Sequence, residues 1–237
     1  MRDILEQGLD VLGLDKSCVP ALERFAALML ERNRVMNLTA ITEPKDVASL
    51  HLLDSLALIP AAGLDSEKIV DVGAGAGFPG MPLAIAKPSL HLTLLDSLGK
   101  RVDFLREACT ALELGNTECV HARAEEFCAD RRESFDAAVS RAVAALPVLC
   151  ELCLPLVKVG GRMLAMKSSH TEEEIAQAET AIQTLGGRLE WIRDYTVPAT
   201  DVIHRVVCVR KISPTPKKYP RRFALIKKSP LGVSGQK

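Results

Sequence analysis

Four glycines that follow a short apolar run are the clearest candidates for chemistry in this sequence. The segment Ile69–Gly80 reads IVDVGAGAGFPG, and Asp71 lies within the run that precedes the glycines. Glycine accepts positive φ and has no Cβ, so a glycine-rich loop can lie directly against a ligand. Pro79 and Pro82 suit the first turn of a helix, where unpaired N–H groups favour an anionic group. The segment therefore predicts a buried strand, a ligand-binding loop and a helix.

The spacing of these glycines separates two classes of cofactor. Gly75, Gly77 and Gly80 have the spacing of the dinucleotide fingerprint G-x-G-x-x-G. The strand is expected to end at Gly73, however, so that register begins too late. Counted from Gly73, Phe78 occupies the place of the third glycine. A G-x-G-x-G loop directly after an acidic strand end is instead typical of methyltransferases that use S-adenosylmethionine (SAM).

From residue 68 onward, apolar runs of strand and helix character alternate. The spacing predicts strands at 68–72, 91–95, 117–121, 135–140, 162–166, 188–195 and 204–210 and helices after Pro79 and over 99–112, 146–157 and 171–185. Thr171 and Glu174 have the spacing of a capping box at the start of the last helix. Such alternation predicts a parallel sheet with helices on both faces.

Ligands in sheets of this kind bind beyond the carboxyl ends of the strands. That rule brings Gly73, Asp96 and Arg141 to one edge, together with Ala124 and Glu125 from the segment after the third strand. Asp96 can accept hydrogen bonds from a ribose diol in either cofactor class. Glu125 can meet an adenine edge or be an exposed acid at a helix start. Arg141 can face both cofactor and substrate, or solvent alone.

The N-terminal part of the chain reads as helices at 3–12, 18–35 and about 44–58. On the last of these, His51, Asp54 and Ser55 are three and four residues apart and share a face. This polar cluster on a leucine-rich helix is either a solvent-exposed stripe or the wall of a site. Spacing alone favours the exposed stripe.

The chain has 237 residues, of which 48% are hydrophobic and 25% are charged. This composition is typical of an ordinary globular protein. No stretch reaches the apolar length of a membrane span, and the N-terminus lacks a secretory signal. Seven scattered cysteines favour reduced thiols in a cytoplasm. Cys150 and Cys153 form a C-x-x-C without a second pair, so we expect core packing and no metal site.

A formal net charge of zero conceals a basic C-terminal end. Residues 202–237 contain ten Lys or Arg and no Asp or Glu, which leaves the rest of the chain acidic. A basic end on an acidic protein indicates an anionic macromolecular partner. The alternative is a solvated tail without a partner.

Taken together, these motifs resemble the RsmG/GidB family, the bacterial 16S rRNA guanine-N7 methyltransferases. The resemblance extends from about Asn37 to Leu231 and is carried by NLTAIT, HLLDSLAL, DVGAGAGFPGMPLAI, LLDSLGKRVDFL, ARAEEF, FDAAVSRAVA and TPKKYPRR with KKSPL. It implies an α/β fold, namely a Rossmann-like class I SAM-dependent methyltransferase sheet with an N-terminal helical extension. It also implies SAM as cofactor and a guanine of 16S rRNA in the small ribosomal subunit as substrate.

The resemblance assigns the SAM contacts to particular positions, and side-chain chemistry and charge suggest the residues that meet the RNA. The family's SAM contacts fall on Gly73, Phe78, Ala124, Glu125 and Arg141, and the general methyltransferase pattern adds Asp71, Gly75, Gly77 and Asp96. The residues expected to hold the guanine are Asn37, His51, Asp54 and Arg141. The residues expected to contact rRNA phosphates are Lys217, Lys218, Arg221, Arg222, Lys227 and Lys228.

The expected organisation has three parts and no membrane segment. Residues 1–62 form a helical substrate-side cap, residues 63–211 a SAM-binding domain and residues 212–237 a basic RNA-contacting tail. We expect a monomer. Two competing functions remain at this point: an NAD-linked oxidoreductase, supported only by the late glycine register, and a non-catalytic RNA-binding module, suggested by the basic tail.

Overall fold

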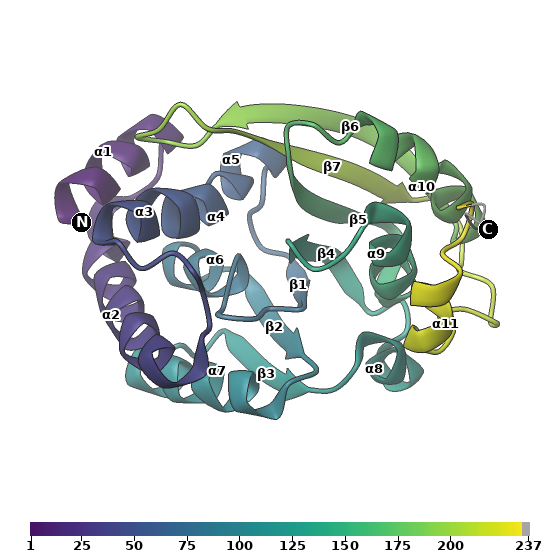
Figure 1. Cartoon of the computed structure of the whole chain (residues 1–237), viewed down its shortest axis with the longest axis horizontal. Helices are drawn as coiled ribbons and strands as arrows, with labels where there is room; N and C mark the ends of the chain where they lie inside the picture. The colour runs from purple at the N-terminus through teal and green to yellow at the C-terminus, as the bar shows by residue number, and fades with distance from the viewer. Residues whose placement is uncertain (234–237) are drawn as a thin grey trace.

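A seven-stranded sheet runs through the computed structural model, which describes residues 1–233 (Figure 1). Its strand order is β3-β2-β1-β4-β5-β7-β6. The strands are β1 (Lys68–Val72), β2 (His91–Asp96), β3 (Thr117–His121), β4 (Phe135–Arg141), β5 (Val157–Ser168), β6 (Gly187–Thr196) and β7 (Ile203–Lys211). The order reverses between β1 and β4, which is where ligands bind in open α/β sheets. The predicted α/β class is confirmed.

One strand runs against the predicted direction. β7 pairs antiparallel with both β5 and β6, so the sheet is mixed and not wholly parallel as the alternation predicted. The short segment 197–202 joins β6 to β7 without a helix. Parallel strands need a crossover of a dozen or more residues, so a connection this short produces a hairpin.

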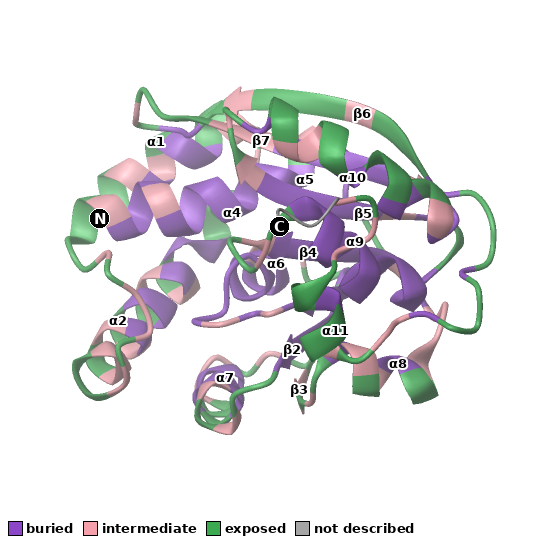
Figure 2. Cartoon of the chain, turned by 45° about the vertical axis from the view of Figure 1, so that its right-hand side comes forward, coloured by how far each residue is buried: buried purple, intermediate pink, exposed green. Residues whose placement is uncertain are grey.

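Helices cover both faces of the sheet and form two hydrophobic cores. One core joins the sheet to α6 (Gly80–Ala86), α7 (Gly99–Ala111) and the N-terminal helices α1 (Arg2–Leu12) and α2 (Val19–Met36). The other joins it to α8 (Ala124–Arg131), α9 (Leu146–Cys153), α10 (Glu172–Thr184) and α11 (Phe223–Lys228). Figure 1 shows the N-terminal helices at one end of the molecule and α8 to α11 at the other. The inner strands are buried, whereas β6 is exposed along most of its length (Figure 2).

The predicted helix over 44–58 is interrupted by a π-helical segment, Val47–Leu53. It begins as α3 (Pro44–Asp46) and continues after the π-helical segment as α4 (Asp54–Leu56) and α5 (Leu58–Ala62). Only 1% of Asp54 and 0% of Ser55 is exposed. The exposed stripe that spacing favoured is therefore wrong, because this polar face turns toward the sheet. π-Helical turns inside helices are frequent at functional sites.

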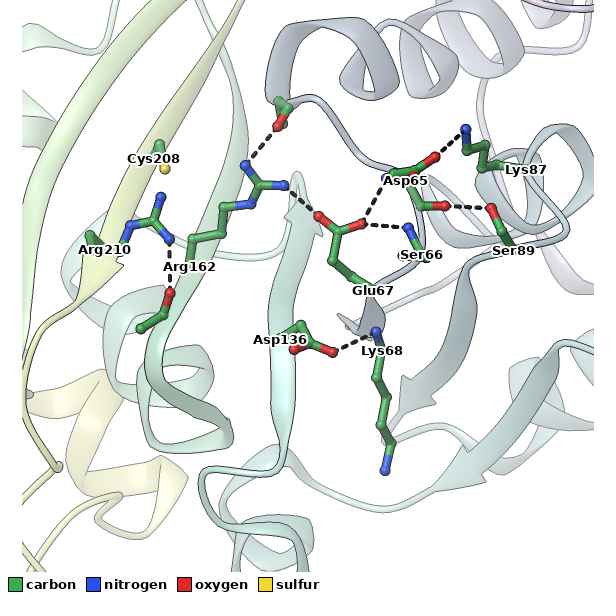
Figure 3. A network of polar contacts seen from close by, with 12 residues as sticks. Asp65, Ser66, Glu67, Lys68, Lys87, Ser89, Asp136, Arg162, Cys208 and Arg210 are labelled. Carbon is green, nitrogen blue, oxygen red and sulfur yellow. Dashed lines mark hydrogen bonds and ion pairs between the residues drawn. The ribbon is translucent and has the colours of Figure 1, made fainter.

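An ion-pair network fixes the junction between the N-terminal helices and the sheet. Arg162 on β5 donates to the Ala62 carbonyl at the end of α5 and, at 2.6 Å, to Glu67 Oε1. Glu67 Oε2 accepts from the backbone N–H groups of Asp65 and Ser66, as Figure 3 shows. These bonds hold the turn before β1 in place, at the end of the sheet opposite to the glycine loop.

The C-terminal segment packs against the second core along most of its described length. Arg132 donates to the carbonyls of Thr215, Pro216 and Tyr219. Arg221 donates to both oxygens of Glu151, which is fully buried on α9. The segment is thus anchored rather than freely solvated; residues 234–237 of the expected tail lie outside the described part of the chain.

Other expectations about the chain can be compared with the structure. Cys150 and Cys153 are fully buried in the core beneath α9, which confirms core packing for both. No helix within residues 1–233 combines the length and the apolar character that a membrane span requires.

Replacing Arg221 by methionine should lower the free energy of unfolding by about 3–5 kcal/mol, because it leaves the Glu151 carboxylate buried without its cation. Urea unfolding measures this directly. Arg222→Met is the matched control, since Arg222 is the exposed neighbour in the sequence. Equal losses in the two variants would mean that the ion pair does not anchor the segment.

Candidate active site

The glycine loop is held by two acids at the ends of neighbouring strands. Gly73, Gly75 and Gly77 have φ of 77°, 59° and 101°, values that favour glycine. Asp96 Oδ2, at the end of β2, accepts from the Gly75 N–H at 2.9 Å. Asp71 Oδ2, in β1, accepts from the Gly80 N–H at 2.8 Å. The loop conformation is therefore fixed before any ligand binds.

Two of the expected cofactor residues lie behind the loop. Asp71 is fully buried between β1 and α6, and burial raises its pKa to about 7. A Cβ on Gly77 would meet Met81 and Phe25 in the core at 2.7 and 3.0 Å. Both residues shape the loop from inside the protein and do not line its cavity, because they face α6 and the N-terminal helices.

The outer surface of the loop lines a cavity of about 430 Å³. Among its lining residues are Gly73, Gly75, Phe78, Asp96 and Arg141. A smaller cavity of about 120 Å³ shares Gly73 and Asp96 with it and extends to Ala124, Glu125 and Phe223. The two cavities together follow the carboxyl ends of β1, β2 and β3, as the sequence predicted.

Phe223 was not expected at this site. It comes from α11 of the basic C-terminal segment, and its N–H donates to Glu125 Oε1 at 3.2 Å. Its aromatic ring lies 5.7 Å from the Arg123 guanidinium carbon. The C-terminal segment therefore forms part of the wall beside Ala124 and Glu125.

A second group of expected residues converges on Arg141 at the end of β4. One Arg141 nitrogen donates to Asp54 Oδ2 at 2.9 Å and to the Leu50 carbonyl at 3.0 Å. The other lies 3.1 Å from His51 Nδ1. The structure thus brings His51, Asp54 and Arg141 together from segments about ninety residues apart in the sequence.

The contacts of His51 determine its protonation. A guanidinium only donates, so Nδ1 accepts from Arg141 and the ring hydrogen is on Nε2. Nε2 lies 2.8 Å from Thr39 Oγ1, which accepts a hydrogen bond from the Nε2–H group. Burial, and then the Arg141 charge, lower the pKa of His51 to about 4. His51 is therefore neutral at pH 7, with both ring nitrogens engaged.

Asp54 is enclosed by donors that the sequence did not indicate. Its Oδ1 accepts from Tyr195 Oη at 2.8 Å and from His204 Nδ1 at 2.7 Å. Burial alone would raise the pKa of Asp54, but the His204 hydrogen bond and the Arg141 charge together hold it below its ordinary value. Tyr195 and His204 are directly paired across β6 and β7. This antiparallel pair thus completes the cluster.

Asn37, also expected at the site, ends α2 in the left-handed conformation with φ of 50°. Its side chain is exposed, and the cavity wall is formed instead by Leu38 and Thr39, which follow it. Asparagine is favoured at such helix ends, which accounts for its presence there without a ligand.

Phe78 links the two groups of residues. Its ring stacks on His51 with the centroids 4.4 Å apart, and the Arg141 guanidinium carbon lies 4.9 Å from its centroid. Arg141 and His51 line the glycine-loop cavity and also a larger cavity of about 600 Å³ on their other side. That larger cavity is further lined by Asp54 and His204 and by residues of β5 and α10.

Five of the six basic residues expected to contact RNA are exposed: Lys217, Lys218, Arg222, Lys227 and Lys228. The sixth, Arg221, is committed to Glu151 as described above. Lys227 and Lys228 lie in the last turn of α11, Arg222 directly precedes this helix, and Lys217 and Lys218 lie in the turn before it. Figure 1 shows α11 on the side of the molecule that carries α8.

Comparison with known proteins identifies the family of the chain. Residues 19–200 match the family described as GidB, rRNA small subunit methyltransferase G. The ribosomal RNA small subunit methyltransferase G of Alkaliphilus oremlandii is 46% identical over 236 residues, covering 98% of this chain and 99% of the relative. The protein of the same name from Lachnoclostridium phytofermentans is 46% identical, with 95% of each chain covered.

Solved structures that resemble the chain support the fold. TYW2 of M. jannaschii, crystallised with AdoMet, superposes with a TM-score of 0.52 and 17% identity, covering 62% of this chain and 70% of that one. At that identity the likeness concerns the fold alone. The extent of the sequence match shows that the chain belongs to the rRNA small subunit methyltransferase G family.

Proposed function

We propose that this protein transfers a methyl group from SAM to N7 of a guanine in 16S rRNA of the small ribosomal subunit. One observation carries the proposal: Arg141 and His51 line both the glycine-loop cavity and a second, larger cavity. A methyl donor on one side of this pair and a nucleotide on the other would be held within reach of each other.

The residues around the glycine loop fit SAM. Gly75 lines the cavity, and a Cβ added to it would have only the Gly73 carbonyl oxygen near it, at 3.8 Å. The bare backbone therefore leaves room for a ligand. Each Asp96 oxygen accepts one backbone N–H, from Gly75 or Leu98, and retains capacity for a ribose hydroxyl. Ala124 and Glu125 would border the adenine. When bound, SAM supplies an electrophilic methyl group.

The protein's own residues would contribute alignment rather than proton transfer. Guanine N7 has an in-plane lone pair and no hydrogen, so its attack on a methyl group requires no general base. His51 matches this requirement, because it is neutral and both of its nitrogens are engaged. Holding two reactants in line can lower a barrier by about 7–11 kcal/mol. Arg141, fixed by Asp54 and Phe78, is the residue best placed to hold the nucleotide.

The rate of methyl transfer in single turnover should be nearly flat from about pH 7 to 9. The pKa of His51, about 4, lies below this window, and guanine N7 loses no proton. Asp71, with a pKa of about 7, is buried behind the loop and does not line its cavity. His51→Gln should lower the rate through positioning without changing the shape of the profile. A steep rise near the unperturbed histidine pKa of about 6.5, abolished by this substitution, would show that a base acts and that N7 is the wrong atom.

The exposed basic residues of the C-terminal segment would contact rRNA phosphates. Such contacts release counterions, so each should add roughly 0.7–0.9 to the slope of log affinity against log salt. Neutralising Lys217, Lys218, Lys227 and Lys228 together should flatten that slope and weaken binding of small subunits. SAM affinity is the internal control. An unchanged slope would mean that these four lysines face only solvent.

The three expected parts of the chain acquire roles in this scheme. Residues 1–62 would cap the substrate side, since His51 and Asp54 come from them. Residues 63–211 would hold SAM, and the basic segment from residue 212 would bind RNA. We expect the enzyme to be a monomer. It would act in the cytoplasm, because its substrate, the small ribosomal subunit, is there.

Equilibrium binding of SAM and of NADH separates this function from that of a dinucleotide enzyme.

A further inference from the structure

A second charged pair lines the larger cavity on the wall formed by β5 and α10. Lys167 Nζ, near the end of β5, lies 2.5 Å from Glu174 Oε1 in the first turn of α10. Both side chains line this cavity and neither lines the glycine-loop cavity. Of these two cavities, the pair therefore lines only the larger one.

The sequence assigned Glu174 a different task. Its spacing from Thr171 predicted a capping box, but Thr171 donates to the Ser168 carbonyl and makes no cap with its side chain. Glu174 Oε1 instead accepts from Lys167 and from the Leu146 N–H. Within residues 1–233, no protein donor is bonded to Glu174 Oε2. One carboxylate oxygen thus retains its full capacity to accept.

We propose that Glu174 and Lys167 recognise the Watson–Crick edge of the guanine, an inference that rests on the proposed function. This edge presents an acceptor, O6, beside two donors, N1–H and the N2 amino group. An ammonium beside a carboxylate offers the complementary set, with Lys167 donating to O6 and Glu174 accepting from N1–H and N2. Adenine has an amino donor in the place of O6 and an unprotonated N1 acceptor in the place of N1–H. Its donor would therefore face the Lys167 ammonium, and its acceptor would face the Glu174 carboxylate.

The position of the pair agrees with the atom that is methylated. N7 belongs to the five-membered ring, whereas N1 and N2 lie at the far end of the six-membered ring. With N7 directed toward Arg141 and the glycine loop, the Watson–Crick edge is directed away from them. Lys167 and Glu174, which come from β5 and α10, line the same cavity as Arg141, together with Thr171. The cavity's volume of about 600 Å³ is large enough to accommodate a nucleotide.

The same pair also holds the segment that follows Arg141. Lys167 donates to the Ala144 carbonyl at 2.7 Å, and Glu174 accepts from the Leu146 N–H. A purely supporting role would lower activity toward every base equally. Recognition of the base predicts a change in preference among bases, so the preference is the decisive readout.

The test compares small subunits that carry guanine or hypoxanthine at the nucleotide modified by the wild-type enzyme. Hypoxanthine keeps N7, O6 and N1–H and lacks only the N2 amino group. The second-order rate constant of single-turnover methyl transfer should be about tenfold or more higher for guanine in the wild type. This is the range expected for the loss of one contact to a base. In Glu174→Gln and Glu174→Ala the preference should fall below about threefold, with SAM affinity unchanged. Glu173→Gln, on the same helical turn, is the matched control and should keep the preference.

Each outcome of this test decides between roles. A lower rate with the wild-type preference intact in both Glu174 variants would assign the pair to support of the 142–146 segment and overturn the inference. SAM affinity verifies that each variant is folded. Failure of the wild-type enzyme to methylate guanine in small subunits would instead overturn the proposed function itself.

Discussion

Replacing Arg141 by lysine should lower the single-turnover rate of methyl transfer to small ribosomal subunits by at least about a hundredfold. The guanidinium bonds Asp54, the Leu50 carbonyl and His51 at once and lies over Phe78. A lysine ammonium is a single point charge and cannot reproduce this fork. Misplacement of a positioning group by about 1 Å is enough for a loss of this size. Rapid-quench assays at saturating SAM and substrate measure the rate.

The chain offers a matched control for this substitution. Arg162 has a side-chain exposure of 16%, against 15% for Arg141, and also bonds one carboxylate and one backbone carbonyl. It lies in the network at the opposite end of the sheet (Figure 3). Arg162→Lys should reduce stability while leaving the single-turnover rate within about threefold. Similar single-turnover rates for the two variants would mean that Arg141 has no specific role in methyl transfer.

Gly75→Val should weaken SAM binding by more than about a hundredfold, which corresponds to about 2.7 kcal/mol. The added side chain would occupy space in the cavity that Gly75 lines, where the nearest atom to a Cβ is the Gly73 carbonyl oxygen at 3.8 Å. The φ of 59° adds backbone strain of about 1–2 kcal/mol. Isothermal titration with SAM measures the affinity, and thermal unfolding measures the strain.

Gly63→Val separates these two effects. Gly63 has a φ of 60°, nearly the same as Gly75, and a Cβ there would meet nothing within 4 Å. It ends α5, outside both cavities lined by Arg141. It should show the same strain with normal SAM affinity. If Gly75→Val and Gly63→Val bind SAM equally well, the glycine loop is not the cofactor site.

Local sequence patterns predicted most of the sheet and the glycine loop. A β-branched run followed by closely spaced glycines specifies a strand and a turn through the backbone alone, so Gly73 and Gly75 could be placed before the fold was known. The direction of β7 could not be predicted from its residues, because strand propensity does not indicate which neighbouring strand pairs with it or in which direction. Only the shortness of segment 197–202 pointed to a hairpin.

The polar cluster shows where local reasoning ends. Spacing placed His51 and Asp54 on one helical face but could not say whether that face met water or the sheet. Tyr195 and His204 adjoin Asp54 only because β6 and β7 pair in a particular register. Glu174 matched a local capping pattern, yet its carboxylate bonds Lys167 from a neighbouring strand. Long-range contacts of this kind follow from the packed fold and leave no periodic signal in the sequence.

The most direct test of the central claim identifies the methylated atom. Purified protein is incubated with SAM labelled in its methyl group and with small ribosomal subunits from cells that lack the gene. The 16S rRNA is then digested to nucleosides, which are separated by chromatography. The proposed function predicts label in 7-methylguanosine alone, approaching one methyl group per subunit, and only a small fraction of that label with Arg141→Lys over the same interval. Label in any other nucleoside, or no label with the wild-type protein, would contradict it.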